Sequence, residues 1–375
     1  MDNIYANPDP AIKYFCSPYT ESAGFTILMK WVLLTRSHPN LLENIKKYVT
    51  ETDINIQNER GFTALMLAVR NSSTLSTDET VKLLLDLGAN IDLQKSDGYT
   101  ALMIAARYCN NESSTNSVKL LLDAGANVNL QDNNKWSALM ITALYSGTDS
   151  TIETVKLLLN ANANLDLQDT DGWTALMKAA SNSTNTSSIE TVKLLLDAGA
   201  SVNLKDNNGY TALIIAVDNS DDNSNIETVE LLINAGASVN LQTIDRWTAL
   251  MLTDDMEIIK LLINAGANVN LQNANGYTAL MLTDDIDIVK LLISTGANID
   301  LQNNDGFSAI ASSGNSDVIR LLINAGANTH LENNSNKNFS KIISENFTHA
   351  TALSILNTLI KYEERLSVSD RLMSY

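Results

Sequence analysis

One short phrase recurs through this chain at fixed intervals, and its period constrains the fold more than any other feature. The phrase reads glycine, aromatic residue, Thr or Ser, Ala, Leu, Met. Its copies are spaced first by 37 and then by 30 residues, and they begin at Gly24, Gly61, Gly98, Lys135, Gly172, Gly209, Arg246, Gly276 and Gly306. A period of this length is typical of a solenoid rather than of a closed enzyme core. Because each unit buries its apolar face only against its neighbours, we expect a stack with long open surfaces.

The composition favours a soluble protein that binds neither nucleic acid nor membrane. Acidic residues outnumber basic ones 43 to 25, which gives a formal charge of −18 and disfavours a phosphate backbone as partner. No apolar run approaches the ~20 residues of a membrane span. The two cysteines, Cys16 and Cys109, have no metal-binding or redox spacing, which fits a reducing, cytoplasmic compartment.

The sequence of each repeat predicts a pair of helices. In the copy that starts at Gly61, Thr63 can cap a first helix over residues 64–70. A second helix is expected over residues 79–87, because its apolar positions recur at helical spacing. Gly88 then supplies the left-handed residue that ends this helix.

The segment between a second helix and the next phrase predicts a projecting turn. Ile91 and Leu93 alternate with polar neighbours, which indicates an extended segment, and residues 96–98 form a turn signal. The variation in length falls between the two helices, where polar insertions such as residues 71–74 belong on the solvent side. The change of period from 37 to 30 removes seven residues there, about two helical turns.

This order of helix, loop, helix and extended turn resembles the ankyrin repeat. The family phrase T-P-L-H-x-A is matched by T-A-L-M-L-A at 63–68, and the family element G-A-N/D-V-N by residues 125–129. The proline and histidine of the family phrase are missing; Met66 and its counterparts replace the histidine, so we expect apolar packing there. The T-A-L-M variant and the Asn/Ser-rich loops are similar to ankyrin proteins of large DNA viruses. The resemblance implies an all-α repeat solenoid of stacked helix pairs with projecting β-turn fingers.

The phase of the repeat predicts the domain organisation. We expect an irregular N-terminal arm (1–23), an N-terminal capping repeat (24–60), five 37-residue repeats (61–245), three shorter repeats (246–335), and a degenerate C-terminal capping repeat with a tail (336–375). Arg246 is expected to begin a thinner segment of the same stack rather than a new domain.

No catalytic, cofactor or metal motif is visible. The three histidines lie far from the cysteines, and no glycine-rich phosphate loop occurs. The acidic groups at 254–257 and 284–287 suggest calcium, but they share the register of S-x-x-E pairs that open the second helices. We therefore interpret these positions as helix N-caps: Ser76, Ser150, Ser187, Ser224, Asp254 and Asp284. We expect no metal, no cofactor and no enzymatic activity.

The aromatic residue that follows each repeat start is the strongest functional signal. These residues are Phe25, Phe62, Tyr99, Trp136, Trp173, Tyr210, Trp247, Tyr277 and Phe307. In ankyrin relatives this position lies at the base of the projecting turn, on the inner surface that binds partners, and large rings dominate protein interfaces. The alternative is that each ring packs on the adjacent turn and stiffens the stack.

Departures from the phrase indicate one candidate binding patch. Lys135 and Arg246 replace glycine, at a backbone cost if the left-handed conformation persists, and Lys178 replaces an apolar residue. The ends of the first helices line the groove in the family. The candidate protein-binding residues are therefore Tyr99, Arg107, Tyr108, Lys135, Trp136, Tyr145, Trp173 and Lys178. We expect both lysines to lie on the surface; the alternative is that the patch is random surface drift.

The resemblance implies a non-enzymatic scaffold that binds a partner protein through its concave groove and finger turns. A second hypothesis is a substrate-receptor subunit of a ubiquitin ligase, a role of some viral ankyrin proteins, although neither terminus carries a convincing adaptor motif. An enzyme is the third hypothesis, because only residues 336–375 follow the repeats. If the chain is viral, the partner is a host protein and the location is the host cytoplasm.

Overall fold

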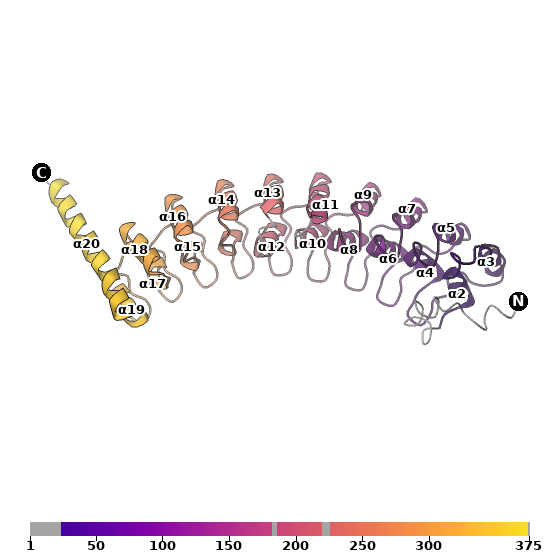
Figure 1. Cartoon of the computed structure of the whole chain (residues 1–375), viewed down its shortest axis with the longest axis horizontal. Coiled ribbons are helices and arrows are strands. Elements are labelled where there is room, and N and C mark those ends of the chain that lie inside the picture. The colour runs from indigo at the N-terminus through magenta and orange to yellow at the C-terminus, as the bar shows by residue number, and fades with distance from the viewer. Residues whose placement is uncertain (1–23, 182–185, 220–225, 374–375) are drawn as a thin grey trace. The chain divides into compact units, whose positions relative to one another are not determined.

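The computed structural model describes a chain whose named elements are all helices. The described residues are 24–181, 186–219 and 226–373, so the predicted N-terminal arm lies outside them. Within them the helices form ten consecutive pairs, shared equally by two compact units, Met1–Asn207 (unit 1) and Asn208–Tyr375 (unit 2) (Figure 1). The prediction of an all-α repeat solenoid is confirmed.

Each pair consists of a first helix and a longer or equal second helix. In unit 1 the pairs are α2 (Ile27–Val32) with α3 (Leu41–Val49), α4 (Ala64–Arg70) with α5 (Asp78–Asp86), α6 (Ala101–Tyr108) with α7 (Thr115–Asp123), α8 (Ala138–Tyr145) with α9 (Ile152–Asn160), and α10 (Ala175–Ser181) with α11 (Thr186–Asp197). In unit 2 they are α12 (Ala212–Asp218) with α13 (Ile226–Asn234), the 3-10 helix η1 (Ala249–Met251) with α14 (Met256–Asn264), α15 (Ala279–Leu282) with α16 (Ile286–Ser294), α17 (Ala309–Ser312) with α18 (Ser316–Asn324), and α19 (Phe339–Asn346) with α20 (His349–Met373).

The first helices form the centre of each stack. Helix α4 contacts α2, α6 and its own partner α5, so it is surrounded on several sides. Thr63 caps it as predicted, with its hydroxyl accepting a hydrogen bond from the Met66 N–H at 3.2 Å. Met66 is only 1% exposed, which confirms that apolar packing replaces the family histidine.

The predicted N-caps of the second helices are wrong by one residue. The caps are Thr77, Thr151, Asp255 and Asp285 instead of Ser76, Ser150, Asp254 and Asp284. Serine at the first two positions is buried between repeats, where the Ser76 hydroxyl lies 3.4 Å from that of Thr35. The neighbouring residue is therefore left to accept the helix N–H groups. Of the other predicted caps, Ser187 lies inside α11 and Ser224 lies outside the described residues.

The segment that joins one pair to the next forms a finger, as predicted, but its first part is not extended. Gly88 ends α5 at φ +85°, as expected. Residues 91–92 then form a turn, because the Asn90 side chain accepts the Asp92 N–H at 3.1 Å. The prediction of an extended segment at Ile91–Leu93 is therefore wrong.

Glutamine side chains tie each finger to the next within a unit. The Gln94 amide donates to the carbonyl of Gly98 in its own finger (2.7 Å) and to the carbonyl of Gln131 in the following one (2.8 Å). The same two bonds recur at Gln57, Gln131, Gln168, Gln242, Gln272 and Gln302. The fingers approach so closely that a Cβ on Gly98 would lie 2.5 Å from the backbone nitrogen of Asn133. The finger register is thus fixed by hydrogen bonds and close backbone contact.

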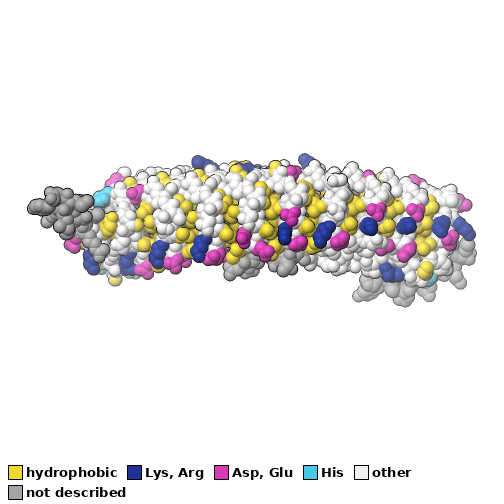
Figure 2. Space-filling view, turned by 90° about the horizontal axis from the view of Figure 1, so that it is seen from above, with side chains coloured by type: hydrophobic (Ala, Val, Ile, Leu, Met, Phe, Trp, Pro, Cys, Tyr) yellow, Lys and Arg dark blue, Asp and Glu magenta, His cyan; other side chains and the backbone are white. Residues whose placement is uncertain are grey.

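The outer face formed by the second helices carries both signs of charge. Figure 2 shows Lys/Arg and Asp/Glu side chains lying next to one another along this face. Several are paired one helical turn apart, such as Lys260 with Glu257 at 2.7 Å and Lys290 with Asp287 at 2.9 Å. Exposed pairs of this kind contribute little to stability. None of the described helices combines the length and apolar character that crossing a membrane requires.

Candidate functional site

All eight predicted site residues lie in unit 1, on three consecutive repeats. Three of them end first helices: Arg107 and Tyr108 on α6, and Tyr145 on α8. Lys178 lies within α10, and the other four belong to fingers. The structure brings most of them into two clusters rather than into one continuous patch.

The first cluster surrounds the Lys178 ammonium group with two tryptophans and a carboxylate. Its Nζ lies 4.1 Å from the ring centroid of Trp136, 4.6 Å from that of Trp173, and 2.8 Å from Oδ2 of Asp169. The other oxygen of Asp169 accepts N–H bonds from Asp171 and Trp173 at 2.9 and 2.8 Å. We call Trp136, Trp173, Lys178 and Asp169 the Trp–Lys cluster. Cation–π contacts and the ion pair compensate the charge where solvent cannot.

The prediction that Lys178 lies on the surface is wrong. The residue is 8% exposed and Asp169 is 4% exposed. In other long repeats the same register holds apolar residues such as Leu67 and Ile104, which are also buried. Position 178 therefore faces the interior of the repeat whatever residue occupies it. A lysine is stable there because its aliphatic stem packs like its apolar counterparts and its charge meets Asp169.

Asp169 is the functional residue that sequence reasoning missed in this cluster. It belongs to a recurring finger position at which Asn58, Asp132 and Asn273 also accept backbone N–H groups. Because residues at this position share the role of accepting finger N–H groups, the pattern alone does not identify Asp169 as the partner of Lys178. A usable signal existed: a lysine at a buried register of the repeat requires a buried acidic partner.

The second cluster alternates arginine and tyrosine, and we call it the Arg–Tyr row. The Arg107 guanidinium lies 3.4 Å from the ring centroid of Tyr145 and 5.7 Å from that of Tyr108. Arg70, one repeat earlier, lies 4.8 Å from the Tyr108 centroid. The arginines also reach forward to acidic groups: Arg70 Nε to Glu112 at 2.9 Å and Arg107 Nη2 to Asp149 at 3.6 Å.

Arg70 was also missed from the sequence. It precedes Arg107 by one 37-residue period, which is the signal that could have identified it. All four side chains of the row are half-buried. Their rings and guanidinium planes are therefore held in place by the protein while part of each remains accessible.

Tyr99 lies close to the row and has the most strongly shifted pKa of the site. Burial raises the pKa of Tyr99 to about 12, and the negative charge of Asp132 adds to this rise, while the Arg107 guanidinium opposes it. Burial also raises the pKa of Asp132, against the N–H bonds that Trp136 and Asn134 donate to it. For Arg107, burial lowers the pKa, but the hydrogen bond to Tyr145 and the nearby phenols outweigh it, so the pKa is raised.

Lys135, like Tyr99, belongs to neither cluster. It is exposed on its finger, and among the described residues its ammonium group forms no ion pair. Its backbone has φ +61°, and Arg246 in unit 2 has φ +63°. The left-handed conformation therefore persists without glycine, and the predicted backbone cost remains at both positions.

The two clusters do not form a surface of uniform positive charge. Each of their cations lies beside an acidic group, and Lys95, near the ring of Tyr99, likewise pairs with Asp97. What the site presents is a set of fixed, partly exposed aromatic faces. In the part of the chain that the structure describes, no three His, Cys, Asp or Glu side chains converge as a metal site would require.

The aromatic ladder of the fingers shares this partial exposure. Among the nine recurring rings Phe62 is buried, at 8% exposure, and the other eight are half-buried. Eight of the nine rings are thus partly covered by the protein and also keep accessible area. The structural and the binding interpretations of these residues are compatible.

Comparisons with known proteins agree with this architecture. A family model described as ankyrin repeats in three copies matches residues 28–132, 109–206, 139–243, 221–303 and 247–333. The chain is 38% identical over 78 residues to the putative ankyrin repeat protein L88 of Acanthamoeba polyphaga mimivirus, which is 20% of this chain and 9% of that protein.

Two further proteins of the same virus show a similar likeness. The putative ankyrin repeat protein L91 is 36% identical over 84 residues, and L122 is 38% identical over 79 residues. Each alignment covers 20% of this chain, and 13% and 12% of the respective relatives. The chain thus spans only a small part of the curated relatives it matches, and its resemblance to viral repeat proteins is confirmed.

Proposed function

Because the chain belongs to the family of ankyrin repeat proteins, whose repeats generally mediate protein–protein interaction, we propose that it is a non-enzymatic scaffold that binds a partner protein through unit 1. The contact surface would comprise the fingers and the first-helix ends, which line the groove of the family. The observation that carries this proposal is the Trp–Lys cluster, in which two half-buried tryptophans are fixed around a buried ion pair.

Fixed aromatic side chains are suited to binding for an energetic reason. Tryptophan, tyrosine and arginine are the residues that most often dominate interface energy. A side chain that is already ordered loses little conformational entropy on association, and this saves about 0.5–1.5 kcal/mol for each side chain that would otherwise be immobilised. The Trp–Lys cluster and the Arg–Tyr row together provide several such side chains on adjacent repeats of unit 1.

The proposal is tested by quantitative affinity capture with the full chain. We expect the double variant Trp136→Leu/Trp173→Leu to lose at least about 90% of the captured partner, because truncation of central anchors costs about 2 kcal/mol or more. Trp247→Leu is the matched control, since Trp247 also follows a left-handed basic residue but belongs to unit 2. Circular dichroism would verify that each variant remains folded.

Equal capture by the folded double variant and the wild type would contradict the proposal. Ubiquitin-ligase subunits among the proteins captured with the wild type would favour the substrate-receptor hypothesis over a simple scaffold. The host cytoplasm as the place of this interaction, and a host protein as the partner, stay predictions from the sequence.

A further inference from the structure

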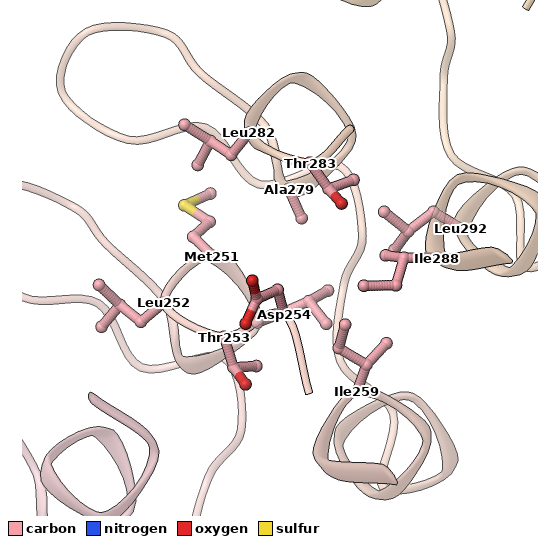
Figure 3. Close-up of a pocket in the computed structure, with 11 residues that line it drawn as sticks. Met251, Leu252, Thr253, Asp254, Ile259, Ala279, Leu282, Thr283, Ile288 and Leu292 are labelled. Carbon is pink, nitrogen blue, oxygen red and sulfur yellow. The ribbon is translucent and has the colours of Figure 1, made fainter. Parts of the chain in front are cut away.

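A pocket of about 350 Å³ lies between two 30-residue repeats of unit 2. In Figure 3 the side chains of Met251 and Leu282 point toward each other on one side, and Ile288 and Leu292 lie on the other. Met251, Ile288 and Leu292 are buried, whereas Leu282 is 41% exposed. The pocket is therefore lined mainly by apolar residues, of which Leu282 is accessible, while polar atoms, including those of Thr253, Asp254 and Thr283, form much of its open surface.

The pocket exists because the first helix of a short repeat is incomplete. In the long repeats the second turn of this helix contributes small residues that are fully buried, such as Ala68 and Val69 in α4. The same register in the short repeat is Thr253 and Asp254, but η1 has already ended at Met251. The space that a second helical turn would fill is left between η1, α15 and the second helices.

One unneutralised carboxylate lies at this pocket. Asp254 is the only charged residue that lines it, and it is exposed. Among the described residues its side chain forms neither an ion pair nor a hydrogen bond, whereas Asp284, one repeat later, accepts a hydrogen bond from Ser313 Oγ at 2.6 Å. That next repeat also has Ser312 where this one has Leu282, so the combination of an accessible leucine and a free carboxylate is particular to the 250–292 pocket.

We propose that this pocket anchors a linear segment of a partner protein that carries a bulky apolar side chain next to a lysine or arginine. The apolar side chain would occupy the pocket, and the cation would pair with Asp254. This inference rests on the proposed protein-binding function and adds a second contact site, in unit 2, with a defined partner chemistry.

Size and charge both support this occupant. A volume of about 350 Å³ is at the low end of the ~300–1,000 Å³ of ligand pockets, which suits one or two side chains better than a cofactor. The net charge of −18 favours the approach of a basic segment over an acidic one. In the Trp–Lys cluster the protein supplies the cation for the buried Asp169 itself; at the exposed Asp254 it supplies none, so this carboxylate is available to a cation of the partner.

The test is a selection of random 12-residue peptides displayed on phage against the immobilised full chain. We expect the enriched peptides to share a large apolar residue within three positions of Lys or Arg. Binding of the synthesised peptides, measured by fluorescence anisotropy, should weaken by at least about tenfold for Leu282→Asp. For Asp254→Asn the binding should weaken by about three- to tenfold and become less dependent on salt concentration.

The matched control is Asp284→Asn, which changes the same register of the next repeat and should leave peptide affinity unchanged. Replacing the basic residue of a selected peptide by norleucine tests the ion pair on the unmodified protein, so the result does not depend on the folding of any variant. This replacement should reproduce the loss seen with Asp254→Asn.

Three results would overturn the inference: no enrichment of any sequence, enriched peptides without a basic residue, or peptides that bind Leu282→Asp as tightly as the wild type. If any of these results is found while partner capture still requires Trp136 and Trp173, the pocket is not a peptide-binding site and the proposed function still holds. Loss of the proposed function would instead be seen as capture that is indifferent to the two tryptophans.

Discussion

The long repeats of unit 1 and the short repeats of unit 2 have nearly the same second helix and very different first helices. Helices α9 and α16 are both nine residues long and read IETVKLLLN and IDIVKLLIS. Their partners α8 and α15 have eight and four residues. The shorter period therefore removes a turn of the central helix as well as loop residues, and an open pocket remains where that turn would pack.

The first helices also differ in how they begin. In the long repeats the preceding Thr or Ser accepts a hydrogen bond from the third helical residue, as Ser137 does from Met140 at 3.3 Å. Thr248 and Thr278 precede η1 and α15 without such a bond. An uncapped single turn is not stable by itself. The short repeats consequently depend more on their neighbours than the long repeats do.

The largest contrast is expected at one register of the repeat, which is buried at Lys178 in a long repeat and exposed at Leu282 in a short one. Lys178→Glu should destabilise unit 1 by about 3–5 kcal/mol, because it places a second carboxylate beside the buried Asp169. Leu282→Glu, in the same register, should change stability by no more than about 0.5 kcal/mol, because this residue is 41% exposed. Urea unfolding followed by tryptophan fluorescence would measure both.

The ion pair itself provides the control for that prediction. Replacing both partners, as Lys178→Leu/Asp169→Asn, should restore most of the stability that Lys178→Glu loses, because no buried charge remains and an asparagine can still accept the finger N–H groups, as Asn58 does. Lys135→Glu, on the exposed finger, should have almost no effect. A double variant that is as unstable as Lys178→Glu would contradict our description of the cluster.

A smaller contrast is expected for core truncation in the first helices. Leu139→Ala in α8 should cost about 3–5 kcal/mol, because Leu139 is 0% exposed and the surrounding helices cannot collapse around the cavity. Leu250→Ala in η1 should cost about 2 kcal/mol, since Leu250 already lines an open pocket. Equal losses of unfolding free energy would show that the short repeat is packed as tightly as the long one.

The fingers should not distinguish the two units, because their geometry is the same in both. Lys135→Gly and Arg246→Gly should each stabilise the chain by about 0.5–1 kcal/mol, through relief of a positive φ that only glycine adopts without strain. Thermal unfolding would measure this gain. A gain in one variant only would indicate that the fingers of the two units differ after all.

The effect that is smallest at neutral pH, and appears only at high pH, concerns Tyr99 of unit 1. Because the pKa of Tyr99 is raised to about 12 in the folded protein, the folded state holds this proton more tightly than the unfolded state, where the pKa is about 10. The stability it provides is complete below about pH 10 and is lost as the pH rises through about 12. Ultraviolet titration should show a late phenolate that Tyr99→Phe removes; an unchanged titration curve would contradict the assignment.

Much of the fold can be predicted from the sequence because the same phrase recurs along the chain and can be compared from copy to copy. The period located the first helices, the Thr63 cap and the left-handed Gly88, since each depends on a local rule. The N-cap of α5 was misplaced because Ser76 and Thr77 are both good caps. Only the contact of Ser76 with Thr35, in the preceding repeat, decides between them.

The candidate site was less predictable, because it too depends on contacts between neighbouring repeats. The sequence indicated that Trp136, Trp173 and Lys178 lie together, but not that the lysine is buried or that Asp169 pairs with it. That pairing depends on how a finger packs against the helix after it, which no local rule describes. The pocket at Asp254 was missed because the acidic residues there were interpreted as caps, a role that belongs to Asp255.

Hydrogen–deuterium exchange on the full chain tests the central claim most directly, namely that the shortened first helices leave residues 246–335 less stable than the long repeats. Helices α9 and α16 have nearly the same sequence and length. A difference between their exchange rates therefore reflects how the neighbouring helices pack on them rather than their intrinsic helix propensity. We predict that the amides of α14 and α16 exchange at least about tenfold faster than those of α7 and α9, a difference of about 1.4 kcal/mol in opening free energy. Equal or slower exchange in α14 and α16 would contradict the account.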